Sequence, residues 1–198
     1  TVTHGLFKLD GGAMFGVVPK PLWSKHHPTD QRNRCDWALR SLLIENGDLL
    51  MLVDCGMGDK QGEKFFGHYA PRNEDLDAQL NAMGFHRNDI TDVFLTHLHF
   101  DHCGGAIRRR EDDPDRFEPA FAEATFWSTD RHWDWTNNPN PREQARHRQH
   151  AKRAHSAQKQ QDRQIHRCRY VQRCASAYVQ LRALHRPSPR PPPTAPCS

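Results

Sequence analysis

The sequence places three histidines and an aspartate within six residues. His97 and His99 are two residues apart, and Asp101 and His102 follow after one further residue. Side chains two apart in an extended strand project from the same side, so we expect the two histidines to converge before the chain turns toward the next two residues. Neutral imidazole and carboxylate suit Zn²⁺, Fe²⁺ or Mn²⁺. The spacing therefore predicts a metal centre built from these four side chains.

The other histidines and the cysteines give a weaker signal. Histidine makes up 14 of 198 residues, so some histidine pairs arise by chance. We expect the isolated histidines to lie on the surface or in loops; these are His26, His27, His68, His86 and His132. The six cysteines form no Cys-x-x-Cys pair, and reduced thiols are expected rather than a disulfide framework or a structural zinc site. Gly104 and Gly105 follow the cluster, where they would let the backbone pass close to metals and open the next helix.

Several short elements precede this cluster. Residues 6–18 are apolar stretches broken by glycines, which suits two short strands joined by turns. The apolar runs 37–45 and 49–54 flank Asn-Gly-Asp, a strong hairpin signal, so the chain should begin with a β-meander. A helix is expected over residues 75–83, with Gly84 just after its end.

The cluster itself is expected at the end of a strand. Residues 90–95 form a short buried run that leads directly into it. A further strand is expected over residues 121–127 and a helix start over 140–143, where Pro141 suits the first turn. Strands followed by alternating helices and strands imply an α/β or α+β layered sheet protein.

Charge divides the chain into two parts. Residues 1–144 carry a net charge of −7, as in an ordinary globular domain, while residues 145–198 carry +11, hold Asp162 as their single acid and contain no glycine. We expect no stable core from this Pro-rich tail. Three interpretations remain open for it: a nucleic-acid-binding arm, a partly helical segment over 158–184, or sequence translated out of frame. Against the first, the tail has only Tyr170 and Tyr178 as aromatic residues that could stack on bases. No apolar run is long enough to span a membrane, no secretory signal is present, and the cytoplasm is the expected location.

The motif at residues 97–102 resembles the His-x-His-x-Asp-His signature of the metallo-β-lactamase-fold hydrolases. Residues 53–58 are similar to the family's earlier Asp-x-Gly strand end, with Asp54 as the acid. The segments 11–16, 96–105 and 133–142 look most like the lactonase and organophosphate-hydrolase branch. The resemblance covers about residues 3–144, roughly the first half to two-thirds of such a domain.

The resemblance implies a fold and a mechanism. The fold would be an αββα sandwich, here complete only in its first half. His97 and His99 would hold one metal and Asp101 and His102 a second, with two zinc ions expected and iron or manganese possible. The metals would activate water toward a lactone, ester or phosphotriester, with Asp101 orienting the nucleophile. Asp54 would either fix the tautomer of a ligating histidine or cap its own turn.

The rest of the family's ligand set is missing from this sequence. No later Gly-His turn, bridging aspartate or final histidine can be assigned after Gly105, which leaves two protein ligands per metal where catalytic zinc normally has three. An inactive metal-binding remnant is therefore the alternative to an active hydrolase, and nucleic-acid binding through the tail is a further one. A half-sandwich would also expose an apolar sheet face, so poor solubility or homo-oligomerisation is expected. The expected partner is a small-molecule substrate, with no membrane partner.

Overall fold

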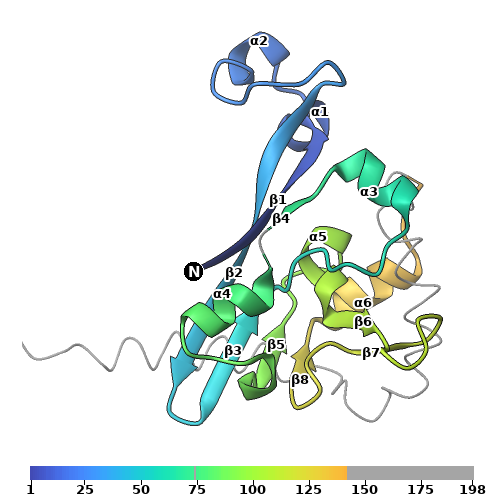
Figure 1. The fold of residues 1–198 in the computed structure, drawn as a ribbon. Helices are drawn as coiled ribbons and strands as arrows, with labels where there is room; N and C mark the ends of the chain where they lie inside the picture. The colour runs from blue at the N-terminus through green and yellow to red at the C-terminus, as the bar shows by residue number, and fades with distance from the viewer. Residues whose placement is uncertain (74, 142–198) are drawn as a thin grey trace, which may run out of the picture.

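A computed structural model describes residues 1–73 and 75–141 of the chain. The fold is a six-stranded mixed sheet with short helices around it, and a separate two-stranded ribbon (Figure 1). This confirms the expected α/β class. The helix start expected over residues 140–143 extends beyond the described residues, and the tail over 145–198 lies outside them, so neither expectation is tested.

The six-stranded sheet has the order β4-β1-β2-β3-β5-β8, and the ribbon pairs β6 with β7. The strands are β1 Val2–Asp10, β2 Arg34–Asn46, β3 Leu49–Val53, β4 Arg72–Asn73, β5 Asp92–Phe94, β6 Ile107–Arg109, β7 Phe117–Pro119 and β8 Thr125–Trp127. The α-helices are α1 Gly11–Phe15, α2 Lys20–Trp23, α3 Glu63–Tyr69, α4 Leu76–Ala82, α5 Phe100–Cys103 and α6 Asp130–Asn137, and two 3₁₀ turns are η1 Arg87–Asp89 and η2 Gly104–Ala106. Within the described residues, no helix is long and apolar enough to cross a membrane.

The expected meander is confirmed, and the pairing changes direction after it. β1, β2 and β3 pair antiparallel in chain order, with Asn46 opposite Leu49 across the turn. Gly47 takes a φ of 61° there, the left-handed conformation that Asn-Gly turns require. β3, β5 and β8 then pair in parallel, so their carboxyl ends share one edge of the sheet.

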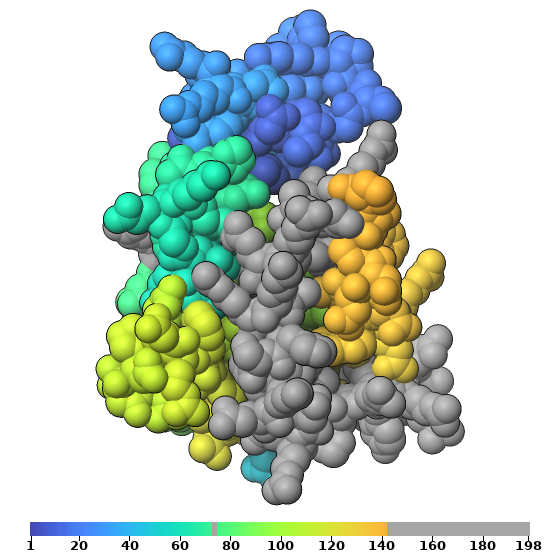
Figure 2. Space-filling model, turned by 90° about the vertical axis from the view of Figure 1, so that its right-hand side faces the viewer, coloured from blue at the N-terminus to red at the C-terminus, as the bar shows by residue number. Residues whose placement is uncertain are grey.

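The two strands expected over residues 6–18 were a wrong prediction. β1 runs unbroken to Asp10, and α1 begins at once because the Asp10 side chain accepts a hydrogen bond from the Ala13 main-chain N–H at 3.1 Å. The helix ends at Gly16, with a φ of 59°. Residues 11–33 form an excursion between β1 and β2, which projects from one end of the molecule in the space-filling view (Figure 2).

The expected helix over residues 75–83 is confirmed as α4. Asp75 caps it by accepting from the Asp77 main-chain N–H at 2.9 Å, and Gly84 follows with a φ of 84°. Leu76 and Leu80 are buried in the same cluster as sheet residues Leu52, Val93 and Phe126. α4 therefore covers one face of the sheet and holds the parallel strands in place.

The expected strands over 90–95 and 121–127 are present in shorter form, as β5 and β8. The chain before β8 turns, with the Ala124 N–H donating to the Phe121 carbonyl at 3.2 Å. Both phenylalanines nearby, Phe121 and Phe126, are nevertheless buried, so the apolar run predicted burial correctly and strand length too generously.

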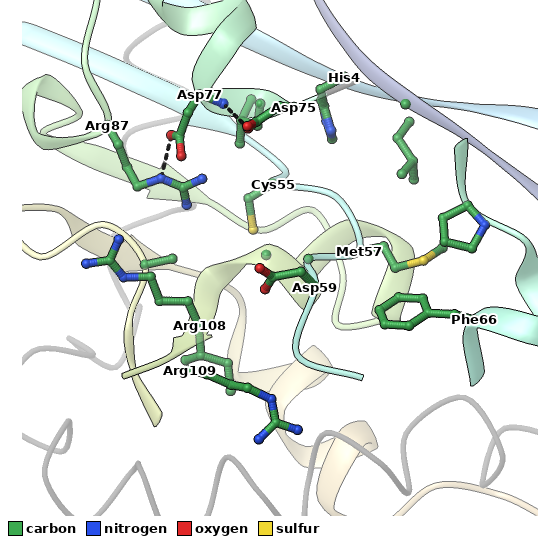
Figure 3. A pocket seen from close by; sticks show the side chains of 18 of the residues that line it. His4, Cys55, Met57, Asp59, Phe66, Asp75, Asp77, Arg87, Arg108 and Arg109 are labelled. Carbon is green, nitrogen blue, oxygen red and sulfur yellow. Dashed lines mark hydrogen bonds and ion pairs between the residues drawn. The ribbon is translucent and has the colours of Figure 1, made fainter. Parts of the chain in front are cut away.

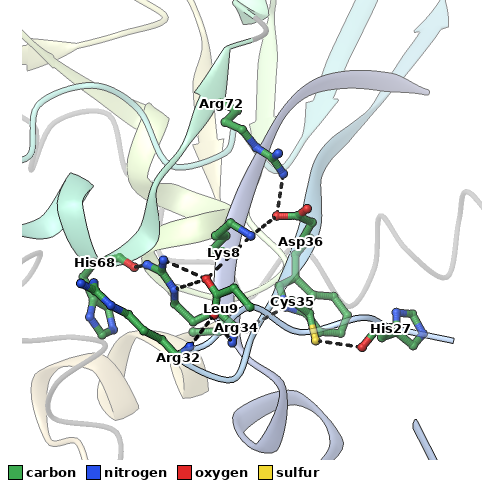
Figure 4. Close-up of polar contacts among 11 residues, drawn as sticks. Lys8, Leu9, His27, Arg32, Arg34, Cys35, Asp36, His68 and Arg72 are labelled. Carbon is green, nitrogen blue, oxygen red and sulfur yellow. Dashed lines mark hydrogen bonds and ion pairs between the residues drawn. The ribbon is translucent and has the colours of Figure 1, made fainter. Parts of the chain in front are cut away.

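Ion pairs and hydrogen bonds join β1 and β2 to each other, to the excursion between them, and to α3 and β4 (Figure 4). Asp36 on β2 contacts Lys8 on β1 at 3.1 Å and Arg72 on β4 at 2.5 Å. Arg34 pairs with Asp30 at 2.9 Å and also donates to the His68 carbonyl at the end of α3. These contacts link the base of the excursion to α3 and β4.

Candidate metal centre

The predicted ligands lie at the carboxyl edge of the parallel strands, where α5 begins (Figure 1). Asp54 follows β3 and Thr96 follows β5, and because these strands are parallel neighbours their ends meet. The Cys55 main-chain N–H donates to the His102 carbonyl at 2.8 Å. This bond joins the loop after β3 to the turn of α5.

The first pair of predicted ligands is His97 and His99. The Nε2 atom of His97 lies 3.1 Å from the Nδ1 atom of His99, with ring centroids 4.5 Å apart. At this distance two nitrogen lone pairs either share one proton or face a common cation. The structure thus brings together the two histidines that the spacing predicted.

The second pair is Asp101 and His102. The Nε2 atom of His102 lies 3.5 Å from the Oδ2 atom of Asp101. The His102 ring is also 4.0 Å from the His97 ring, centroid to centroid, so the two pairs are adjacent. All four predicted side chains therefore occupy one site.

Asp54 supports this site through hydrogen bonds to His102 and Thr96. It has a φ of 57°, a left-handed conformation that aspartate tolerates better than most residues. Its carboxylate accepts from His102 Nδ1 at 2.8 Å, from the Thr96 main-chain N–H at 2.9 Å and from the Thr96 hydroxyl at 2.8 Å. Of the two roles left open for Asp54, these contacts favour holding a histidine tautomer, because the carboxylate reaches His102 and Thr96.

Burial and neighbouring charges set the protonation of the site. Burial, with the nearby His102 and His99 rings, lowers the pKa of His97 to about 4, so this imidazole is neutral at neutral pH. Burial also opposes a charge on His102, but the hydrogen bond to Asp54 and the charge of Asp101 outweigh it and raise the pKa of His102. Burial disfavours ionised Asp54, yet hydrogen bonds from His102 and Thr96 outweigh that and lower the pKa of its carboxyl group.

The donor atoms fit divalent metals in pairs. Tetrahedral zinc with bonds of about 2.0–2.1 Å separates two ligand atoms by about 3.3–3.4 Å. The separations within the two pairs, 3.1 Å and 3.5 Å, lie on either side of that value. Across residues 1–73 and 75–141, however, no three His, Cys, Asp or Glu side chains are arranged to hold one ion. Each pair thus supplies half of a tetrahedral ligand set.

The two glycines after α5 only partly fulfil the expectation. They are the first two residues of the short 3₁₀ segment η2, which leads into β6, and no α-helix begins there. A Cβ on Gly104 would lie 2.2 Å from the Met57 carbonyl oxygen, and one on Gly105 would lie 2.1 Å from the Cys55 carbonyl oxygen. Their close approach is to the loop after β3, which carries Asp54, and only glycine fits there.

His132 was expected to be isolated, but the structure places it beside the site. It lies on α6, with its ring centroid 6.4 Å from that of His97. α6 begins where the Thr129 side chain accepts from the His132 main-chain N–H at 3.2 Å. A Thr-Asp pair is a helix-start signal that would have predicted this element from the sequence.

The cysteines in the described part of the chain are free thiols, as expected. Cys35, Cys55 and Cys103 form no disulfide there. Burial raises the pKa of the Cys103 thiol to about 12 and also raises that of Cys55. Both thiols are therefore protonated at neutral pH in the metal-free protein.

A separate pocket of about 660 Å³ is lined in part by the loop after β3 (Figure 3). His4, Met57 and Phe66 are among its lining residues, and Asp59 and Arg109 carry charge into it. The four predicted ligands do not line it. The pocket and the candidate metal centre therefore both contact the loop of residues 54–59 but have different lining residues.

Comparisons with known proteins agree with this geometry. A family model described as the metallo-beta-lactamase superfamily matches residues 40–112, which include the four predicted ligands. Two probable metallo-hydrolases, one of Mycobacterium tuberculosis and one of Mycobacterium bovis, are each 32% identical over 108 residues. The matches cover 47% of this chain and 35% of each relative, so the chain spans about a third of the length of these curated relatives.

Solved structures share the fold over a larger part of the chain. A probable metal-dependent hydrolase from Staphylococcus aureus is 31% identical with a TM-score of 0.66, covering 74% of this chain and 51% of that one. The dizinc quorum-quenching lactonase AidC is 25% identical with a TM-score of 0.51, covering 70% of this chain and 43% of that one. The hydrolase AbOPH, at 18% identity and a TM-score of 0.58, shows likeness of fold alone. The motif, the sheet and these matches agree that residues 40–112 of this chain are similar to the metallo-β-lactamase superfamily.

Proposed function

We propose that this chain is a metal-dependent hydrolase whose centre lies between His97, His99, Asp101 and His102. The observation that carries the proposal is the juxtaposition of two donor pairs with ligand-like separations of 3.1 Å and 3.5 Å. An ordinary hydrogen bond between two histidines would explain the first pair but not the adjacent Asp101–His102 pair. The superfamily match over residues 40–112 and the metallo-hydrolase relatives support the same reaction class.

The residues of the chain would divide the work. Two bound divalent ions would lower the pKa of water and polarise a carbonyl or phosphoryl oxygen. Neutral His97 offers a nitrogen lone pair at neutral pH. The Asp101 carboxylate would orient the attacking water by accepting a hydrogen bond from it. Asp54 holds His102 so that its Nε2 atom points toward Asp101.

We propose zinc as the metal and a lactone, ester or phosphotriester as the substrate. AidC is described as a dizinc lactonase in complex with its product, which supports zinc and a cyclic ester. Imidazole and carboxylate ligands are also compatible with iron or manganese. The proposed substrate class rests on likeness to solved structures of which this chain covers 51% and 43%.

A metal-binding protein without turnover is the second candidate. It is favoured because the described residues supply two ligands to each proposed ion and no third ligand. With two protein ligands per ion, zinc would bind more weakly than in a three-ligand catalytic site.

Hydrolysis by the full 198-residue chain separates these candidates. The metal-free protein is loaded with zinc and assayed on an aryl ester, an N-acyl-homoserine lactone and an aryl phosphotriester. We expect zinc-dependent turnover that falls at least about a hundredfold in His97→Ala and is retained in His68→Ala, a matched histidine outside the site. Zinc binding without turnover on all three substrates would favour the inactive candidate, and turnover that survives His97→Ala would overturn the assignment.

A further inference from the structure

Thr96 lies between the Asp54 carboxylate and His97, the first histidine of the motif. Its hydroxyl oxygen lies 2.8 Å and 3.0 Å from the two oxygens of Asp54 and 3.1 Å from Nδ1 of His97. Its main-chain N–H donates to the same carboxylate at 2.9 Å. The side chain is therefore held by two anchors at once.

Counting protons fixes the direction of these bonds. A hydroxyl has one proton to donate, and a carboxylate at neutral pH only accepts. The proton of Thr96 must therefore point to Asp54, and the hydroxyl oxygen must accept from Nδ1–H of His97. His97 then carries its proton on Nδ1 and its lone pair on Nε2, the atom that lies 3.1 Å from His99.

Asp54 acts on the second histidine directly. His102 Nδ1 lies 2.8 Å from the carboxylate and donates to it, which leaves the lone pair of its Nε2 facing Asp101. One carboxylate thus orients both rings, His102 by direct contact and His97 through the Thr96 hydroxyl. The tautomer of an imidazole is set by the hydrogen bond that its other nitrogen makes, so both lone pairs depend on this network.

We propose that Thr96 is a positioning residue that holds His97 in the Nδ1–H tautomer and so presents its Nε2 lone pair to the first metal. The inference rests on the proposed metal centre for its purpose. It makes its own claim about the metal-free protein, where the tautomer is already fixed by Asp54 and Thr96.

The direct test is ¹⁵N NMR of histidine side chains in the metal-free full chain near pH 8, with the His97 signals assigned by their loss in His97→Gln. Wild type and Thr96→Ser should show a protonated Nδ1 and a bare Nε2. Thr96→Val, which removes the hydroxyl at nearly constant volume, should shift His97 toward the Nε2–H form. Thr125→Val, a threonine on the neighbouring strand β8, is the matched control and should leave His97 unchanged.

A second variant reaches the same network from the other end. In Asp54→Asn the amide can donate to the Thr96 hydroxyl oxygen, which frees the Thr96 proton to bond Nδ1 of His97. Asparagine tolerates the left-handed φ of this position. The prediction is again a shift of His97 toward Nε2–H, so this variant decides the matter if Thr96→Val does not fold.

Zinc titration then connects the tautomer to metal binding. We expect Thr96→Val to weaken zinc binding about 10- to 100-fold and Thr96→Ser to stay within about threefold of wild type. A His97 tautomer that stays Nδ1–H in both Thr96→Val and Asp54→Asn would overturn the inference. If wild type binds no zinc, the proposed function fails, while the NMR result still decides the role of Thr96.

Discussion

At the residue scale, burial of a histidine on β1 is expected to make the folded protein sensitive to acid. His4 on β1 is 6% exposed and its Nε2 lies 2.8 Å from the Ser41 hydroxyl on β2. Burial is the main cause that lowers the pKa of His4 to about 4. The folded protein therefore holds His4 neutral under conditions in which the unfolded chain binds a proton.

The first prediction concerns stability between pH 6.5 and 4. Because the pKa of His4 is lower in the folded state, its contribution is complete above about pH 6.5 and is lost as the pH falls toward 4. The full shift corresponds to roughly 3 kcal/mol in the free energy of unfolding. Urea unfolding of wild type and His4→Gln, which cannot titrate, should show a smaller loss for the variant. Equal pH slopes for both proteins would rule out this role of His4.

The candidate site was the part of the molecule most accessible to sequence reasoning at this scale. Three imidazoles and a carboxylate at offsets 0, 2, 4 and 5 define a donor set before any fold is known, and all four side chains converge. The roles of Thr96 and His132 were not foreseen. Thr96 acts through a residue 42 positions earlier, and His132 reaches the site through a helix that had not been predicted.

At the element scale, the two loops that meet beneath the site are packed backbone against backbone. The Gly105 main-chain N–H donates to the Gly56 carbonyl at 2.9 Å, and the Lys60 ammonium group donates to the Gly104 carbonyl. This contact leaves no space for a Cβ atom at Gly104 or Gly105. Direct backbone contact therefore holds the loop after β3 against the turn after α5.

The second prediction tests this contact. A Cβ at Gly105 would lie 2.1 Å from the Cys55 carbonyl oxygen, so Gly105→Ala should lower the free energy of unfolding by about 2 kcal/mol or more. Gly67→Ala is the matched control, since no atom lies within 4 Å of its Cβ position in α3, and alanine there should raise stability by about 0.5–1 kcal/mol. Denaturant melts give both values. A neutral Gly105→Ala would show that the loops are not in contact.

Elements were predictable where local chemistry decides them. The Asn46-Gly47 turn and the Asp75 cap act within a few residues, and both elements are present as expected. β5 and β8 came out shorter because their ends depend on neighbours distant in sequence, such as the bond from the Leu95 N–H to the Trp127 carbonyl. The helix after Asp10 was missed because the glycines were assigned to turns, whereas the side chain of Asp10 caps a helix there.

At the scale of the whole molecule, the strand register places apolar side chains on the sheet face opposite α4. Leu6 pairs with Ala38, and Leu42 pairs with Val53, which pairs in turn with Phe94. Leu6 is 39% exposed and Leu42 is 47% exposed. We call these five residues the open face, the side on which a second sheet would pack in an αββα sandwich.

The third prediction is that the full chain self-associates through the open face. Exposed apolar area on a sheet favours pairing with another copy. Leu42→Lys should therefore lower the average mass measured by light scattering, while Met83→Lys should leave it unchanged. Met83 is the matched control because it is 42% exposed and follows α4 on the other side of the sheet. A wild-type protein that is monomeric at all concentrations would contradict the prediction.

We propose that the four motif side chains bind two metals in two pairs. Anomalous diffraction at the zinc absorption edge, from crystals of the full chain grown with zinc, tests it most directly. We expect one peak between His97 Nε2 and His99 Nδ1 and a second between Asp101 and His102 Nε2, with both peaks absent in a His97→Ala, His102→Ala double variant. Zinc bound elsewhere, with these four side chains unchanged and free of metal, would contradict it.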